Sequence, residues 1–143
     1  MGGLLARVYL SRHRPAKLGR VVLLGTPNGG SEVADILGRF SIYGALLGPA
    51  ALQLGTAYSR DKINPRYPVA YPVGVVAGNR TIDPISSFFF LPQPNDGKVS
   101  VANTRLDGMA DHIVLKVAHS FLASNDEAIR QTMAFVREGR FVA

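Results

Sequence analysis

Three short apolar runs divide the chain: Val21–Leu24, Val73–Ala77 and Ile113–Val117. The first run is apolar on both faces, the third is interrupted by Lys116, and all three are bounded by glycine, proline or polar residues. This pattern is typical of strands buried on both sides within a parallel sheet. Helical patterns precede the first run and follow the last. The alternation therefore predicts an α/β fold, a mostly parallel sheet flanked by helices.

The first helix is predicted from Gly3 to about Arg12, with Pro15 preventing its continuation. Its apolar residues are spaced one and four positions apart, which is typical of a helix face buried against a core. The residues expected on this face are Leu4, Leu5, Val8 and Tyr9.

The last helix has signals at both ends. Ser124 and Glu127 fit the capping-box pattern S-x-x-E at its start, and Gly139 is expected to end it. The predicted buried stripe of this helix consists of Ile129, Met133 and Val136.

The middle of the chain is apolar but broken by glycines from Val33 to Leu54. Ser31 can cap a helix that begins there. Short helices that cover a binding site and an ordinary packing layer both explain this composition. We expect a helical, lid-like insertion at about residues 31–55, followed by a surface loop over residues 57–67.

Composition limits the possible classes of protein. The chain has 143 residues, enough for one domain, and 47% of them are hydrophobic, enough to build a core. It contains no cysteine, which excludes disulfides, thiolate metal sites and cysteine nucleophiles. No apolar run approaches the roughly 18 residues that a membrane span requires.

Positive charge is concentrated at the start of the chain. The formal net charge is +6, and five basic residues precede the first acid, Glu32: Arg7, Arg12, Arg14, Lys17 and Arg20. A basic face of this kind can contact nucleic acid, anionic lipid or an acidic partner. A solvated helix end, where cations suit the negative end of the helix dipole, explains the charges without any partner. Aromatic residues do not interleave with these charges, so we do not expect nucleic-acid binding.

The three histidines differ in their predicted positions. His13 lies between two arginines in a stretch expected to be exposed, whereas His112 and His119 flank the third strand. Active residues of open parallel sheets gather beyond the carboxyl ends of strands, where His119 is expected. The seven steps from His112 to His119 span roughly 20 Å in an extended chain, so one site cannot use both.

Asp96 is the candidate partner of His119. It lies in the loop that follows the second strand, at the same predicted edge of the sheet. A histidine that acts as a general base needs an acceptor on its second nitrogen, which fixes the tautomer. The rivals are Asp83, Asp107 and Asp111, of which the last two precede the third strand. Without such a partner, the Asn95-Asp96-Gly97 triplet is an ordinary turn.

The first three residues suggest where a nucleophile belongs. Met1-Gly2-Gly3 opens a helix that has no strand before it, as an ordinary helix start can do. It also fits the back half of a nucleophile elbow, G-x-S-x-G, cut directly after its serine. Within the chain, Ser31 is a rival, since it lies between a strand and a helix. Val33 stands where the elbow needs glycine, however, and a role as helix cap already explains Ser31.

Several stretches together resemble the α/β-hydrolase superfamily, in its lipase- and esterase-like branch. Met1–Arg7 is similar to the continuation of a G-H-S-M-G-G elbow, and Val22–Ser31 to the strand and loop that follow it. Asn95–Val99 resembles the acid loop of these enzymes, and His119–Phe121 their histidine loop. The resemblance covers nearly the whole chain and implies that residues 1–143 form a single partial domain, the C-terminal half of the α/β-hydrolase fold.

The resemblance implies a serine hydrolase that acts on small-molecule or lipid esters and needs no cofactor or metal. Asp96 then becomes the triad acid and His119 the general base. The backbone N–H of Met1 becomes an oxyanion-hole donor, and the segment at 31–55 takes the place of a lid. The nucleophilic serine and the strands before it are not among these 143 residues. We therefore expect the isolated chain to be inactive, since nothing in it forms the covalent intermediate.

Three functions from different classes follow from these observations. The first is a hydrolase truncated by a start at an internal methionine. The second is a short enzyme that uses Ser31. The third is a non-catalytic module that binds nucleic acid or anionic membranes through Arg12, Arg14 and Lys17. The lack of a signal peptide favours the cytoplasm only if the chain is not truncated, and peripheral membrane contact is compatible with all three.

Overall fold

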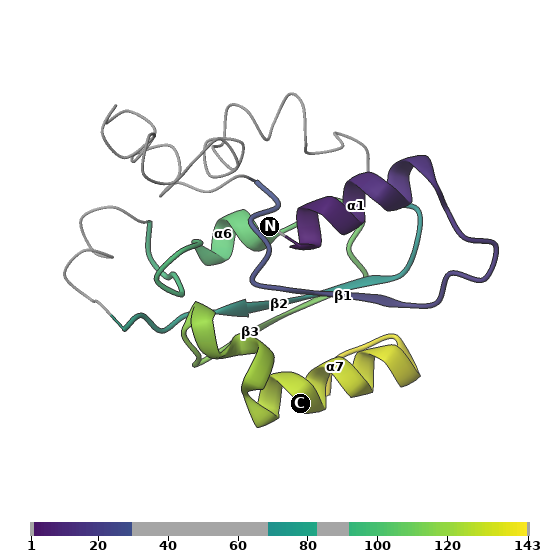
Figure 1. The fold of residues 1–143 in the computed structure, drawn as a ribbon. Coiled ribbons are helices and arrows are strands. Elements are labelled where there is room, and N and C mark those ends of the chain that lie inside the picture. The colour runs from purple at the N-terminus through teal and green to yellow at the C-terminus, as the bar shows by residue number, and fades with distance from the viewer. Residues whose placement is uncertain (1, 30–68, 83–91, 143) are drawn as a thin grey trace, which may run out of the picture.

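The computed structural model describes residues 2–29, 69–82 and 92–142. These residues form a three-stranded parallel sheet with helices on both faces, which confirms the predicted partial α/β fold (Figure 1). The strands are β1 (Val21–Leu24), β2 (Val73–Gly78) and β3 (Asp111–Leu115). The helices are α1 (Gly2–Arg12), α6 (Val101–Thr104), the 3₁₀ helix η2 (His119–Ser124) and α7 (Asp126–Glu138).

The strands lie in the order β1-β2-β3, and both pairings are parallel. Val21 of β1 is in register with Val73 of β2, and Gly74 of β2 with Asp111 of β3. The carboxyl ends of all three strands therefore meet at one edge of the sheet. The loops after β2 and β3 leave from this edge.

Side-chain alternation along the strands divides the core into two layers. Leu23, Val73 and Val75 belong to the layer beneath α1 and the residues that follow α6. Val76 and Leu115 belong to the layer on the opposite face, which η2 and α7 cover. Figure 1 shows α1 and α6 on one side of the sheet and α7 on the other. The central strand β2 is therefore buried along its whole length, as its apolar sequence predicts, whereas β1 and β3 are partly exposed and Val114 of β3 is 38% exposed.

Helix α1 has the predicted bounds but a different buried face. Leu4 is 1% exposed, whereas Leu5 is 60% and Tyr9 57% exposed, so the expected burial of these last two is wrong. Arg7 is buried in their place, three residues after Leu4. The buried face follows the i, i+3 spacing, and a hydrogen bond from the Arg7 guanidinium to the Asn28 side chain satisfies part of its polar surface.

Strand β3 begins two residues earlier than predicted, at Asp111, and ends at Leu115. The Asp111 carboxylate accepts hydrogen bonds from the His112 and Phe141 N–H groups, at 2.8 Å each. A polar residue can therefore open the strand without an unsatisfied buried group. His112 lies within β3, near its amino end.

Helix α7 differs from its prediction at its start and on its faces. Asn125 is the N-cap, and its side chain accepts a hydrogen bond from the Ala128 N–H, so the predicted Ser124 cap is wrong. The stripe of Ile129, Met133 and Val136 is 45–48% exposed instead of buried. Phe135 packs inward instead and is fully buried. The predicted end at Gly139 is confirmed, with φ of 81°.

Part of the N-terminal positive charge has a structural role. Arg20 Nη1 donates hydrogen bonds to the carbonyl oxygens of Val136 and Arg137 in the last turn of α7. These carbonyls have no partner within the helix, so Arg20 caps its end.

The predicted lid-like insertion at 31–55 and the surface loop at 57–67 lie outside the described residues. In the ranges that the structure describes, no helix has the length and hydropathy to cross a bilayer.

Candidate active site

Asp96 and His119 meet at the carboxyl edge of the sheet. Asp96 lies in the loop between β2 and α6, and His119 opens η2, with three residues between it and the end of β3. The His119 Nδ1 atom lies 2.7 Å from the Asp96 Oδ2 atom. Two residues that are 23 positions apart in the sequence thus form a direct side-chain hydrogen bond, because the two strands before them are parallel neighbours.

The Asn95-Asp96-Gly97 turn fixes the Asp96 carboxylate. Its Oδ1 atom accepts hydrogen bonds from the main-chain N–H groups of Lys98 (3.0 Å) and Val99 (2.8 Å). The Asn95 side chain accepts a further bond from the Gly97 N–H, and Gly97 adopts a φ of 94°, which favours glycine. One carboxylate oxygen is thereby bound to the loop, which leaves the other to His119.

The main chain reinforces this pairing. The His119 N–H donates a hydrogen bond to the Asp96 carbonyl oxygen at 3.0 Å. His119 is therefore attached to Asp96 through both its backbone and its ring, which restricts the orientation of the imidazole.

The hydrogen bond determines the chemistry that is open to the ring. A carboxylate only accepts hydrogen bonds, so His119 Nδ1 carries a hydrogen and donates a hydrogen bond to Asp96. In the neutral ring, Nε2 is then an acceptor that can take a proton from another group. The Asp96 side chain is fully buried, whereas 30% of the His119 side chain is exposed. His119 is thus the member of the pair that a reacting group can reach.

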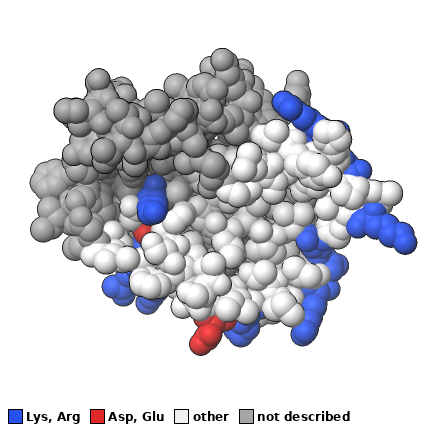
Figure 2. All heavy atoms as spheres, in the orientation of Figure 1, with Lys and Arg blue, Asp and Glu red and all other residues white. Residues whose placement is uncertain are grey.

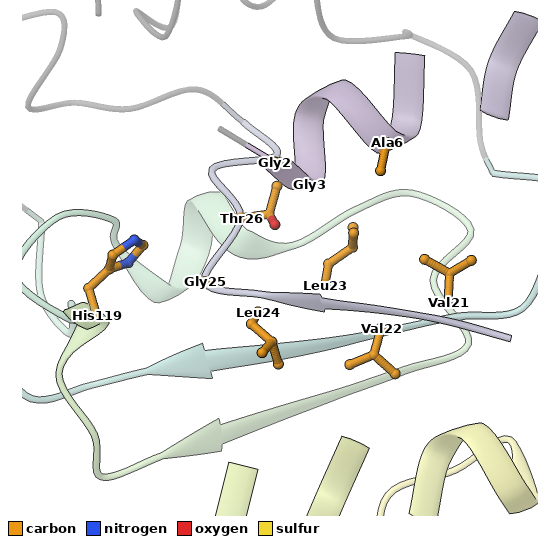
Figure 3. A pocket seen from close by; sticks show the side chains of 10 residues that line it. All are labelled: Gly2, Gly3, Ala6, Val21, Val22, Leu23, Leu24, Gly25, Thr26 and His119. Carbon is orange, nitrogen blue, oxygen red and sulfur yellow. The ribbon is translucent and has the colours of Figure 1, made fainter. Parts of the chain in front are cut away.

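His119 lines a cavity of about 400 Å³ between the start of α1 and the end of β1. The other lining residues are Gly2, Gly3, Ala6, Val21, Val22, Leu23, Leu24, Gly25 and Thr26. Figure 3 shows the His119 ring on the Gly25 side of this cavity, with Thr26 next to Gly2 and Gly3. The N-terminus of a helix, with its partial positive charge, and a histidine therefore border the same space.

Two glycines allow the close approaches around the cavity. A Cβ atom on Gly3 would overlap the Thr26 side chain, so α1 can approach the loop after β1 only without one. Gly25 has φ of 53°, and a Cβ there would lie 3.0 Å from His119 Nδ1 and 2.8 Å from Leu122 Cδ1. Both glycines keep the helix start and the histidine close to the end of β1.

A polar network that the sequence analysis did not predict supports the α1 side of the site. Arg7 Nη1 donates to Asn28 Oδ1 at 3.0 Å, and Asn28 Nδ2 donates to the Thr104 carbonyl at 2.6 Å. The Thr104 hydroxyl donates to the Val101 carbonyl and accepts from His112 Nε2 at 3.0 Å. The network connects α1, the loop after β1, α6 and β3. The one hint of this network in the sequence is Arg7, a charged residue that lies three positions after Leu4 and therefore on the same face of α1.

The other candidates from the sequence fall into two groups. His13 stacks on Tyr9, with ring centroids 5.4 Å apart, and His112 binds Thr104, so neither is the histidine bound to Asp96. Met1 and Ser31 lie outside the described residues, as does Asp83. The catalytic roles assigned to Asp96, His119 and Met1 stay predictions, although the structure brings the first two together.

No protein-family model matches the sequence, and no curated protein matches it either. Among solved structures, the chain is similar to a Bacillus licheniformis lipase, BlEst2, in its mature form, with 23% identity and a TM-score of 0.61. The match covers 87% of this chain and 56% of the lipase. The propeptide form of the same lipase matches with 21% identity and a TM-score of 0.66, covering 95% of this chain and 33% of the other.

This likeness supports an α/β-hydrolase-like fold. The chain spans about half the length of the mature lipase and a third of the propeptide form.

Proposed function

We propose that this chain carries the acid–base pair of a serine hydrolase that acts on carboxylic esters. In this proposal His119 is the general base, and Asp96 orients its ring and stabilises the imidazolium. The observation that carries the proposal is the 2.7 Å contact from His119 Nδ1 to the buried Asp96 carboxylate, with the histidine lining a cavity.

The nucleophile in this proposal is a serine directly before Met1, in a polypeptide longer than these 143 residues. Among the described residues that line the cavity, Thr26 carries the one hydroxyl group. Threonine nucleophiles use the chain's own terminal amine as their base, whereas Thr26 is internal, is 4% exposed and packs against Gly3. A serine before Met1 would enter the cavity at the start of α1, opposite His119.

The main-chain hydrogen-bonding pattern of β1 is compatible with a further strand beside it, after which the chain would continue into this serine. The Val21 N–H donates to the carbonyl of Pro72, the residue before β2, at 2.9 Å, and the Gly25 N–H donates to the carbonyl of Val76 in β2 at 2.8 Å. Because alternate residues of a strand direct their main-chain groups to opposite sides, those of Val22 and Leu24 point away from β2. Residues 21–24 line the same cavity as Gly2 and Gly3. A further parallel strand beside β1 would therefore end near the start of α1.

The proposed reaction has two steps. His119 Nε2 takes the proton of the serine as its oxygen attacks the ester carbonyl, and the imidazolium then protonates the departing alkoxide. Water then attacks the acyl-enzyme as His119 Nε2 takes its proton, and the imidazolium protonates the serine oxygen as the acyl–oxygen bond breaks, which releases the carboxylic acid and restores the serine. The backbone N–H of Met1 and the positive end of the α1 dipole stabilise the oxyanion in both steps.

The substrate class in this proposal is a small-molecule or lipid ester, and the chemistry needs no cofactor. The 143-residue chain alone would not turn over esters, since it lacks the covalent nucleophile.

Hydrolysis of a short-chain aryl ester tests the proposal. We expect no turnover by the 143-residue chain and turnover by a chain extended through the codons directly upstream of Met1. In the extended chain, His119→Ala should lower kcat at least about a thousandfold, and Asp96→Asn by about three to four orders of magnitude. Turnover by the 143-residue chain that Ser31→Ala abolishes would contradict the proposal and favour the short-enzyme alternative.

A further inference from the structure

Three cationic residues lie in the segments at the carboxyl edge of the sheet that adjoin Asp96 and His119 in the sequence. Arg80, Lys98 and Lys116, which we call the cationic rim, are all exposed. They come from three different segments, namely the loop after β2, the turn that holds Asp96, and the end of β3.

Main-chain contacts bring these segments together. The Arg80 N–H donates a hydrogen bond to the carbonyl of Val117, the residue after Lys116, at 3.3 Å. Gly97, which precedes Lys98, packs against Thr81, since a Cβ built on it would lie 2.9 Å from the Thr81 hydroxyl oxygen. The cationic rim is therefore a property of the fold and not of a run of basic residues in the sequence.

The rim carries no compensating charge among the described residues of its loops. Within residues 79–82, 92–98 and 116–121, Asp96 is the one acid, and it is 2% exposed and bound to His119. Figure 2 shows lysine and arginine side chains at the left of the molecule, the end toward which the strands point in Figure 1. Among the described residues of these three segments, the net charge is therefore positive.

Two large apolar side chains project from the same loops. Ile82, in the loop after β2, is 68% exposed, and Phe121, two residues after His119, is 56% exposed. Single exposed apolar side chains are common on protein surfaces, so what matters here is that these two belong to the same segments as the cations. Cations next to exposed apolar residues are the combination that binds anionic membrane surfaces.

We propose that the cationic rim, with Ile82 and Phe121, binds an anionic lipid surface and holds the His119 cavity against it. The cations contact the lipid phosphates, and the two apolar side chains enter the boundary between headgroups and acyl chains. A single-stranded nucleic acid fits less well, because Ile82 offers no ring for a base to stack on. The proposal goes beyond ester hydrolysis, since binding requires no nucleophile.

Co-sedimentation of the 143-residue chain with vesicles tests this proposal. We expect binding to vesicles that combine phosphatidylcholine and phosphatidylglycerol, little binding to phosphatidylcholine alone, and weaker binding as salt rises. The triple variant Arg80→Gln, Lys98→Gln, Lys116→Gln should bind at least about tenfold more weakly. Phe121→Ser should remove the binding that persists at high salt.

The matched control is the triple variant Arg12→Gln, Arg14→Gln, Lys17→Gln, which loses the same charge from the N-terminal face. Its binding should stay within about twofold of the unmodified chain. Equal losses in the two triple variants would contradict the proposal, because they indicate a response to net charge alone. Equal binding to both vesicle types, or no binding to either, would also contradict it. So would a competition in which single-stranded DNA displaces the rim variant and the unmodified chain equally from the vesicles. None of these outcomes depends on ester hydrolysis.

Discussion

At the scale of single residues, Asp96 has every part of its carboxylate assigned to a partner. Oδ1 accepts two main-chain N–H groups and Oδ2 binds His119, while the side chain is fully buried. Topology alone predicted this pair, because both residues follow neighbouring parallel strands. The Asn95-Asp96-Gly97 turn sets the conformation in which one carboxylate oxygen of Asp96, Oδ1, faces the loop.

Replacing Asp96 tests the orientation of the His119 ring directly. In the 143-residue chain we expect a proton resonance of His119 Nδ1–H far downfield, with slowed exchange with water, because the proton is held by a buried carboxylate. Asp96→Ala should abolish this signal in the NMR spectrum. Asp107→Asn is the matched control, since Asp107 is an exposed acid that precedes β3. A signal that survives Asp96→Ala would show that Asp96 does not hold the ring.

Arg7 marks a limit of prediction at the same scale. A charged residue in an amphipathic helix is expected in solvent, so the apolar pattern predicts a buried face of Leu4, Leu5, Val8 and Tyr9 without Arg7. The arginine is buried because Asn28, 21 residues away, offers an acceptor. The position of Asn28 depends on how the loop after β1 folds. The spacing of apolar residues within α1 carries no information about that loop.

His112 should make stability depend on pH. Burial, and secondarily the Arg105 guanidinium, lower the pKa of His112 below its unfolded value of 6.5, with Asp111 opposing. The folded state then binds its proton less readily than the unfolded state does. Stability from this group is complete above pH 6.5 and is lost as pH falls from there toward the folded pKa.

The variant His112→Gln, which can still donate to Thr104, should show a smaller loss of Tm between pH 7.5 and 5.5. Thermal unfolding followed by circular dichroism measures the difference. An identical loss in both proteins would contradict the assignment, because His13 and His119 are present in each.

At the scale of elements, the sequence predicts the bounds of the strands more accurately than the buried faces of the helices. β1 and β2 were predicted within one residue, because runs that are apolar on both faces and bounded by glycine have few alternatives. β3 was placed two residues late, since its polar start is stabilised by contacts of Asp111 with Phe141 beyond α7. The stripe of α7 was wrong because Phe135, not Met133, packs against Gly74 of β2.

The start of α7 provides a stability test with a matched pair of variants. Asn125→Ala should lower the free energy of unfolding by about 1 kcal/mol, because its side chain accepts the Ala128 N–H. Ser124→Ala should change it by less than about 0.5 kcal/mol, since its hydroxyl bonds only the Phe121 carbonyl at an exposed position. Chemical denaturation measures both. A larger loss of unfolding free energy for Ser124→Ala than for Asn125→Ala would instead support the capping box that the sequence predicts.

At the scale of the whole molecule, the described residues hold one side of a possible active site. The acid, the histidine, the cavity and the start of α1 are together, and β1 lies at one edge of the described sheet. The order of these parts along the chain was predictable from their motifs. The cavity itself was not, because it depends on how Gly3 and Gly25 let α1 and His119 approach β1.

The most direct test of the account is covalent labelling with a fluorophosphonate, read by intact mass and peptide mapping. The protein is the chain extended through the codons upstream of Met1, together with its His119→Ala variant. We expect one adduct, on a serine directly before Met1, which the variant forms far more slowly. An adduct on Ser31, a stop codon in place of that serine, or equal labelling of the His119→Ala variant would contradict it.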